Sequence, residues 1–232
     1  MSSSSNPAAD LAISKTSNIS IQEATVSEVD SMTTILARSF HPVNPFITKV
    51  YPDTPLMRKW FATLYNDEIN NSGISYPLVA IDTTTNSVVG ILALRLMGAD
   101  EHGSGMWTNH SLCKDHQAEM HKDMCNSMTS HRERLMLGRP HFLIQLFGMD
   151  HAYKGRQLGK RLLLRAFEIA DQAGLEIFVQ ANASARGIYL KQGFEEKEVV
   201  VMPGDLKYTE HMLTRTCIVP ARPAGNGTGA IP

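Results

Sequence analysis

A cationic segment with two glycines is the first feature of the sequence that could do chemistry. Residues 154–163, KGRQLGKRLL, lie between an apolar run and a run with helical periodicity. A helix start leaves backbone N–H groups unpaired and carries partial positive charge, so an anion such as a phosphate can bind there. Gly155 allows the backbone to approach an anion closely, and Gly159 allows the first helical turn to pack against it. Positive charge would come from Lys154, Arg156, Lys160 and Arg161.

Two interpretations of this segment stay open on its own residues. It lacks the Gly-Lys-Ser/Thr of a Walker loop and the GxGxxG of a dinucleotide fingerprint. A solvated basic helix start without any ligand explains the same residues about as well as a phosphate cradle does.

The segment 97–139 contains two pairs with the spacing of metal ligands, Cys113-x-x-His116 and His121-x-x-x-Cys125. Helical spacing of three or four residues can place such pairs on one face. The region is, however, rich in His and Met throughout, and a helical lid over a binding cleft is the favoured interpretation. Its methionines suit either an adaptable apolar wall or an ordinary core. We therefore expect no metal.

Composition indicates an ordinary globular protein. The 232 residues are 43% hydrophobic and 19% charged, with a formal charge of −1, which gives no reason to expect nucleic acid or a membrane surface as a partner. Three scattered cysteines suggest a reducing compartment, and no run approaches the ~20 apolar residues of a membrane span. The first residues lack the pattern of a secretory signal, so a cytoplasmic location is expected.

One domain is expected to position the cationic segment. Residues 1–17 are rich in Ser and small residues and predict a disordered segment, and 217–232 predict a flexible tail. Between them, 18–216 should form a single domain with a helical insertion at about 97–139.

The order of elements predicts a mixed α/β sheet with helices on both faces. Alternating or apolar runs predict strands at 19–24, 77–82, 88–96, 141–150, 175–182, 193–202 and 207–215. Helices are expected at 27–40 with Ser27 as the N-cap, and at about 56–70, 111–137, 158–173 and 183–192. The four prolines of residues 41–55 predict a loop or broken turn.

A second motif follows the cationic segment, NASARGIYLKQGF at residues 182–194. Together, YKGRQLGKRLL and this Asn…Ala…Tyr…Gly-Phe pattern resemble the GNAT-type N-acetyltransferase superfamily. The resemblance covers about 19–215, and the predicted element order is also similar to that of the family. The loop FHPVNPFITKVYPD (40–53) is similar to a segment of a fungal and bacterial branch that modifies small molecules.

The resemblance implies a sheet that splays into a V-shaped acyl-CoA cleft, with acetyl-CoA as the acyl donor. The pantetheine arm would bind the backbone of strand 144–150, at Phe147, Gly148 and Met149. A glycine inside an apolar strand often marks a close backbone approach, which supports Gly148, although core packing is the alternative for each of these residues. The pyrophosphate would lie on the amides of Lys154, Gly155, Arg156, Gln157, Leu158, Gly159 and Lys160.

The cationic segment departs from the family signature, Gln/Arg-x-x-Gly-x-Gly/Ala, at two positions. Lys154 replaces Gln or Arg and keeps the charge. Gln157 stands at the first glycine position, and Gly159 at the second. We expect Gln157 to have ordinary helical backbone angles, with its side chain pointing away from the phosphate.

The resemblance also implies a general acid, Tyr189. Attack of an amine on the thioester expels a thiolate, and a phenol with a pKa near ~10 can protonate it. A core tyrosine with a satisfied hydroxyl is the alternative. Asn182 would either contact the cofactor or cap the next helix.

The general base is less defined by the sequence. Asp150 and His151 follow the splayed strand directly and are the first candidates. His141, His41 and a chain of water molecules without a dedicated base are the alternatives.

The predicted function is transfer of an acetyl group from acetyl-CoA to the amine of a small molecule, directly within a ternary complex. No cysteine lies in a matched motif that could carry the acyl group. A protein or peptide N-acetyltransferase and a non-catalytic acyl-CoA sensor are the alternatives; the acceptor itself, and N- versus O-acylation, stay open. A monomer or homodimer is expected.

Overall fold

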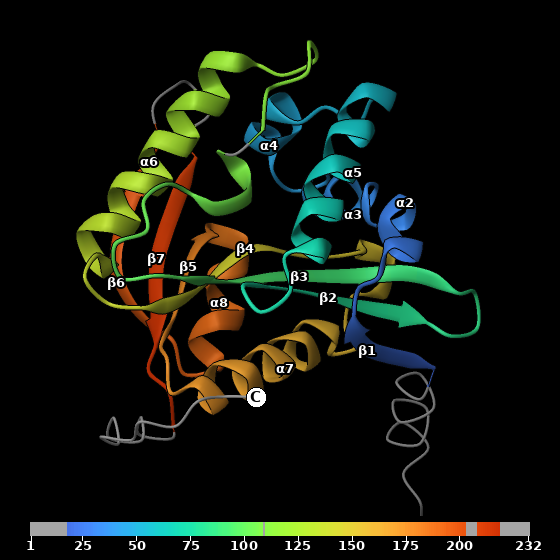
Figure 1. The fold of residues 1–232 in the computed structure, drawn as a ribbon. Helices are drawn as coiled ribbons and strands as arrows, with labels where there is room; N and C mark the ends of the chain where they lie inside the picture. Colours follow the sequence, from blue (N-terminus) through green and yellow to red (C-terminus); the bar gives the residue numbers. More distant parts are fainter. Residues whose placement is uncertain (1–17, 109, 203–207, 219–232) are drawn as a thin grey trace, which may run out of the picture.

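A seven-stranded sheet forms the centre of the computed structural model, which describes residues 18–108, 110–202 and 208–218. The predicted disordered segment 1–17 and most of the predicted tail lie outside the described residues. The strands lie in the order β1-β2-β3-β4-β5-β7-β6 (Figure 1). They are β1 (Ile19–Glu23), β2 (Ser75–Asp82), β3 (Ser87–Met97), β4 (His141–Met149), β5 (Ile177–Asn182), β6 (Glu195–Val201) and β7 (Thr209–Arg215). Among the strand pairs of the described residues, only β4–β5 is parallel.

Helices cover both faces of this sheet, as predicted (Figure 1). One face carries α2 (Val29–Met32), α3 (Ile35–Phe40), α4 (Pro45–Val50), α5 (Pro55–Asn70) and α6 (Ala118–Met136), and the other carries α7 (Leu158–Ala173) and α8 (Ala183–Lys191). Short 3-10 turns are η1 (Val26–Glu28), η2 (Gly105–Trp107) and η3 (His151–Tyr153). Among the described helices, none is both long enough and apolar enough to cross a bilayer.

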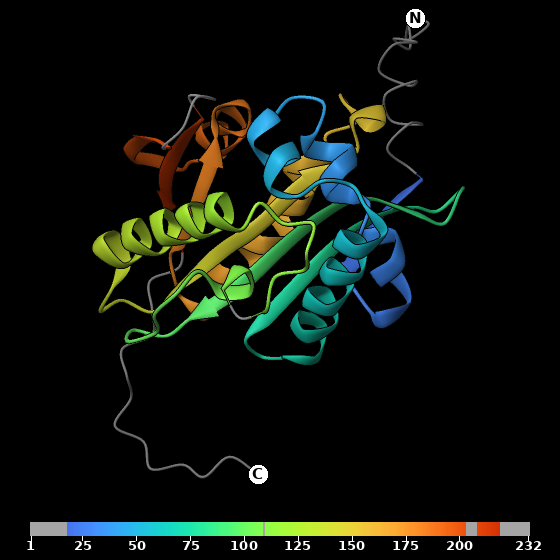
Figure 2. The ribbon, with the colours of Figure 1, turned by 90° about the horizontal axis from the view of Figure 1, so that it is seen from above.

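The central strands are apolar because they are buried on both sides. In β2, Val79 and Ile81 pack into the core under α2–α6, whereas Leu78 and Ala80 pack into the core under α7 and α8. The apolar stripe of α7 is buried throughout, at Leu158, Leu162, Leu163, Ala166, Phe167 and Ala170, and Gly174 ends the helix in a left-handed conformation. Seen from above, α5 and α6 lie across different parts of the sheet (Figure 2).

The helix predicted from Ser27 to residue 40 is wrong in its start and its continuity. Thr25 is the cap, because its hydroxyl accepts from the Ser27 amide while its own amide donates to Glu28 Oε2 at 2.7 Å. The segment then divides into η1, α2 and α3.

Two further boundaries differ from the prediction. The proline-rich segment 41–55 contains α4, because Asn44 caps the Ile47 amide at 3.1 Å and Pro45 takes the first helical position, where proline is tolerated. The insertion helix α6 begins at Ala118, not near residue 111. The carbonyl of Ser111 instead accepts from Trp60 Nε1 at 2.9 Å, which ties the preceding loop to α5.

The sheet opens between its two parallel strands. β4 pairs with β5 only where Phe142–Ile144 face Ile177–Val179, and no pairing continues toward Met149 and Asn182. On its other side, β4 stays paired with β3 as far as Met149. The ends of β4 and β5 therefore diverge and leave unpaired backbone on both sides of a V-shaped opening.

A bulge at Gln145 attaches the insertion to this opening. Ala93 pairs with Leu146 and Leu94 with Ile144, so Gln145 is the extra residue of β4. Its side-chain oxygen accepts from the Met106 amide at 2.5 Å, and its carbonyl accepts from Trp107 Nε1 at 3.0 Å. The η2 turn is thus fixed against β4 beside the opening.

Gly105 is required for this attachment, and its replacement tests it. It has a φ of +62°, and a Cβ there would lie 1.9 Å from Gln145 Oε1. Gly105→Ala should lower the free energy of unfolding by about 1–2 kcal/mol through left-handed backbone strain. Overpacking against Gln145 should lower it by about 1–3 kcal/mol more. The control is Gly138→Ala, where φ is +82° and a Cβ would meet open space. Urea unfolding of both variants measures the difference, and equal losses would contradict the role of Gly105.

Candidate active site

A cavity of about 490 Å³ lies between the cationic loop and the free end of β4. We call it the loop cavity. Nine of the residues predicted to bind the cofactor line it, namely Phe147, Met149, Lys154, Gly155, Gln157, Leu158, Gly159, Lys160 and Asn182. Gly148 and Arg156 are not among its lining residues, and Tyr189 lines a second cavity instead. The Arg156 guanidinium lies over the Tyr153 ring, 4.4 Å from its centroid.

The loop cavity has the features of an anion site. It is bounded by the start of α7, whose 16 residues give it a full dipole, and by Lys154 and Lys160. The Gln157 side chain caps none of the first-turn amides. Gly155 has a φ of +83°, a conformation that glycine adopts at little cost. The residues present therefore fit the pyrophosphate of CoA.

The prediction for Gln157 is wrong. Its backbone is left-handed, with φ +58° and ψ 18°, instead of helical. The position needs a positive φ because the chain must reverse between Lys154 and α7, which explains why such loops carry glycine there. Glutamine adopts this conformation at a cost of about 1–2 kcal/mol.

Gly148 and Gly159, which were predicted to approach the cofactor, lie close to other groups of the protein. A Cβ at Gly148 would lie 2.9 Å from Ser39 Oγ, so the close approach in β4 is made by α3. The Ser39 hydroxyl also accepts from the Met149 amide at 3.0 Å. At Gly159, a Cβ would lie 2.7 Å from both Ile188 Cδ1 and Met149 Sδ.

None of the side chains considered as general bases lines the second cavity, but Asp150 and His151 line the loop cavity. Asp150 pairs with Arg38 at 2.6 Å and accepts from the Ala152 amide at 2.8 Å. His151 Nε2 lies 3.0 Å from the Ser39 carbonyl oxygen, and His41 Nε2 lies 2.9 Å from that of Tyr51. His141 is at the opposite end of β4, and burial lowers its pKa to about 4.

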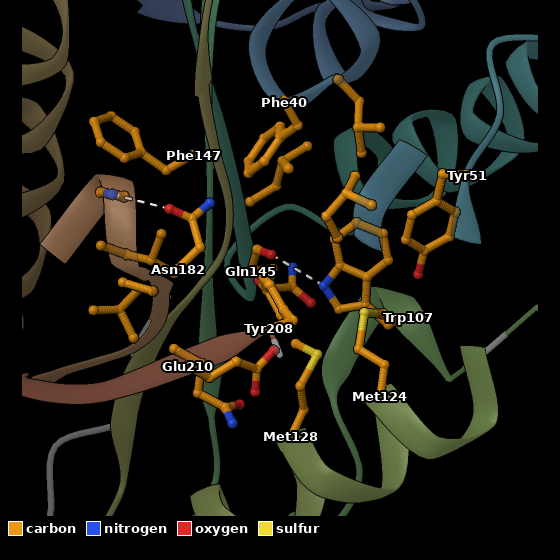
Figure 3. Close-up of a pocket in the computed structure, with 18 of the residues that line it drawn as sticks. Phe40, Tyr51, Trp107, Met124, Met128, Gln145, Phe147, Asn182, Tyr208 and Glu210 are labelled. Carbon is orange, nitrogen blue, oxygen red and sulfur yellow. Dashed lines mark hydrogen bonds between the residues drawn. The ribbon is translucent and has the colours of Figure 1, made fainter. Parts of the chain in front are cut away.

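A second cavity, of about 80 Å³, lies deeper between the two arms of the opening (Figure 3). We call it the inner cavity. Its apolar wall includes Phe40 from α3, Trp107 from η2, and Met124 and Met128 from α6. It shares Phe40, Phe147, Asn182 and Ala185 with the loop cavity, so the two cavities adjoin at the point where β4 and β5 part.

Tyr189 lines the inner cavity from α8. The residue is 2% exposed, and its ring packs against those of Phe147 and Phe194, with centroids 5.6 and 5.1 Å away. Burial raises the pKa of the Tyr189 hydroxyl. The hydroxyl therefore keeps its proton at neutral pH and serves better as a hydrogen-bond donor than as a full proton donor.

Asn182 takes the capping role. Its side-chain oxygen accepts from the Ala185 amide at 2.9 Å (Figure 3) and from the Ser184 hydroxyl at 2.7 Å. It therefore fixes the start of α8, the helix that carries Tyr189.

Glu210, which lines the inner cavity from β7, was not predicted from the sequence. The side chain is buried, and its Oε2 has no hydrogen-bond partner among the described residues. Burial raises the pKa of Glu210 to about 7. The signal was present in the alternation of TEHMLTR, which puts Glu210 on the same buried side as Met212. A carboxylate at such a position is costly and calls for an explanation.

The Cys and His pairs of the insertion belong to an aromatic cluster. His116 and His121 pack edge-on with ring centroids 5.4 Å apart, and both contact the Tyr51 ring. Cys113 Sγ lies 3.2 Å from His116 Nδ1, and Cys125 Sγ lies 3.4 Å from His121 Nε2. No three His, Cys, Asp or Glu side chains within the described part of the chain are grouped to hold a metal.

Comparisons with known proteins agree with this geometry. Residues 40–194, more than half of the chain, match the Acetyltransferase (GNAT) family. No curated protein matches the sequence.

Three solved structures illustrate the likeness of fold. A mosquito arylalkylamine N-acetyltransferase like 5b has a TM-score of 0.61 at 15% identity, covering 85% of this chain and 99% of its own. An agmatine N-acetyltransferase mutant has a TM-score of 0.65 at 11% identity, covering 86% and 99%. The ribosomal-protein-S18-alanine N-acetyltransferase of Escherichia coli has a TM-score of 0.51 at 11% identity, covering 91% and 99%.

The match over residues 40–194 includes the opening between β4 and β5, the cationic loop and the helix that carries Tyr189. The chain therefore belongs to the GNAT family and is an acetyl-CoA-dependent acetyltransferase.

Proposed function

We propose that this enzyme transfers an acetyl group from acetyl-CoA to the amine of a small molecule, directly within a ternary complex. The observation that carries the proposal is the small inner cavity, one wall of which is formed by Trp107 of η2 and by Met124 and Met128 of α6. At about 80 Å³ it accepts the end of a small molecule, whereas a peptide would need an open groove. The similarity of residues 40–53 to the small-molecule branch supports the same conclusion.

The loop cavity would bind the cofactor, and the inner cavity would bind the acceptor. Lys154, Lys160 and the first amides of α7 would hold the pyrophosphate, and the free edge of β4 would hold the pantetheine arm. The thioester would then lie near Phe147, where the cavities adjoin. Acetyl-CoA supplies the activated acetyl group, and the Tyr189 hydroxyl donates to the sulfur as the carbon–sulfur bond breaks.

Two other functions are the alternatives to a small-molecule transferase, a protein N-acetyltransferase and an acyl-CoA sensor. Protein N-acetyltransferases share this fold, as the Escherichia coli structure illustrates, but a likeness of fold does not transfer a substrate. A sensor that binds acyl-CoA without turnover would have no use for Tyr189. A cytoplasmic location and a monomeric or homodimeric state stay predictions.

An acceptor panel separates these functions. Thiol release from acetyl-CoA is measured with amines, amino acids, aminoglycosides and peptides. We expect turnover with small amines. Turnover with peptides alone would contradict the proposal, and a thermal shift with acetyl-CoA without any turnover would identify a sensor.

Tyr189→Phe tests the role of the hydroxyl. The variant should lower kcat about 100-fold or more, the usual cost of removing one hydrogen-bond donor to a developing negative charge, while its affinity for CoA stays unchanged by calorimetry. Tyr76→Phe is the control, because Tyr76 lies in β2 and lines neither cavity. An unchanged kcat in Tyr189→Phe would remove Tyr189 from the mechanism.

Gln157→Gly tests the strain in the cationic loop. Glycine removes the left-handed strain of about 1–2 kcal/mol but adds about 0.5–1 kcal/mol of chain entropy. Stability in urea should therefore rise by roughly 0.5–1 kcal/mol, and affinity for CoA should not fall. Gln22→Gly in β1 is the control and should lose stability. A loss of similar size in both variants would show that residue 157 gains nothing from glycine.

A further inference from the structure

We infer that Glu210 binds the acceptor's ammonium group in the inner cavity and accepts its proton, and that the acceptor is a primary amine on an apolar skeleton without a carboxylate. This inference rests on the proposed function and names its substrate class. Four features of the inner cavity carry it: the unpartnered carboxylate, the neutrality of its surroundings, the apolar wall and the small volume.

The carboxylate of Glu210 is placed for a ligand. Glu210 pairs with Asn182 across β5 and β7, and its side chain is 4% exposed. Its Oε2 has no hydrogen-bond partner among the described residues, and Glu210 is one of the residues that line the cavity. A buried carboxylate without a partner is destabilising, so a bound cation would offset the cost that the free protein bears.

The titratable groups that face Glu210 leave its charge uncompensated. Tyr51, Tyr208 and Cys125 all feel the charge of Glu210, and burial raises the pKa of each one. Burial also lowers the pKa of His121, whose Nδ1 lies 3.0 Å from the Tyr51 hydroxyl. All four groups are therefore neutral at pH 7.

The rest of the cavity wall determines which chemical groups the acceptor can carry besides its amine. Among the described residues that line it, Glu210 is the one charged side chain (Figure 3). An acceptor with a carboxylate beside its amine would meet repulsion from Glu210, with no cationic side chain on the wall to pair with it. A second cationic group on the acceptor would likewise find no second carboxylate on this wall to pair with. A single cation on an apolar skeleton fits both conditions.

The volume limits the size of that body. About 80 Å³ is roughly half of the ~150 Å³ cavity that holds benzene. An aromatic ring would enter only if part of the wall moved, and Met124 and Met128 are unbranched and flexible enough to do so. Short branched amines should therefore enter with less rearrangement than aromatic ones.

The reaction balances with Glu210 as the base. The ammonium gives one proton to the Glu210 carboxylate, and the freed nitrogen lone pair forms a bond to the thioester carbon. The carbon–sulfur bond breaks, and its electron pair leaves with the sulfur. The nitrogen loses a second proton, which reaches the thiolate to give CoA, assisted by Tyr189. The products are an N-substituted acetamide and CoA, and the proton on Glu210 passes to solvent.

Glu210→Gln is compared with Glu195→Gln, an exposed control in β6. Two matched pairs of acceptors differ only by a carboxylate: 3-methylbutylamine against leucine, and 2-phenylethylamine against phenylalanine. In the wild type, each amine should exceed its amino acid at least 100-fold in kcat/KM. Glu210→Gln should lower kcat/KM for the amines at least 100-fold without changing affinity for CoA in calorimetry.

The pH profile separates a proton acceptor from a structural residue. In the wild type, kcat/KM for 3-methylbutylamine should rise with pH through an inflection near 7, and Glu210→Gln should lack the inflection. Because the folded-state pKa of Glu210 is raised to about 7, the folded protein keeps a proton on Glu210 that the unfolded chain releases above pH 4.5, so the stability falls as the pH rises from 4.5 to 7. The melting temperature of Glu210→Gln should therefore exceed that of the wild type by a margin that grows over this range.

Several outcomes would overturn the inference. If Glu210→Gln kept the wild-type kcat/KM and the wild-type inflection, Glu210 would have no role in binding or deprotonating the acceptor. The same conclusion would follow if the amino acids reacted as well as the matched amines. Such results would leave a small-molecule transferase in place, whereas turnover with peptides alone would overturn the proposed function itself. If Glu210→Gln fails to fold, the wild-type profile decides, since an inflection is required.

Discussion

The parting of β4 and β5 after three paired residues is the constraint on which the rest of the structure depends. If the pairing ended at the edge of a sheet, water could hydrogen-bond the backbone groups that it leaves free. Here the pairing ends in the middle of the sheet, with the buried residues of two cores on either side. The unpaired backbone beyond Ile144 and Val179 must face a ligand, water or a cover. Both cavities lie there, and the shared wall at Phe147 and Asn182 is where donor and acceptor can meet.

The opening is kept open from two directions. On the side of α7, the cationic loop reverses through Gly155 and Gln157 before the helix begins, and the strain at Gln157 is the cost of this reversal. On the side of the insertion, the bulge at Gln145 holds Met106 and Trp107 beside the strand end. The insertion thus adds Trp107, Met124 and Met128 to the wall of the inner cavity, and our proposal of a small acceptor rests on this wall.

Much of this could be predicted from the residues, for physical reasons. The apolar runs of β2 to β5 and the stripe of α7 have strong periodicities, and their elements were found at nearly the right bounds. The start at Thr25, the helix α4 and the left-handed Gln157 were missed, because caps and backbone reversals depend on single hydrogen bonds and contacts. Glu210 was missed for a different reason: its importance comes from the neutrality of neighbours far away in sequence, Tyr51 and Cys125.

We propose that donor and acceptor meet where the two strands part, with the acceptor's nitrogen at Glu210. A crystal structure of the enzyme with CoA and 3-methylbutylamine tests it most directly. We predict the CoA pyrophosphate at the start of α7, its sulfur beside Phe147 and Tyr189, and the amine nitrogen within hydrogen-bond distance of Glu210 Oε2. An amine bound outside the inner cavity, or a CoA sulfur remote from Phe147, would contradict it.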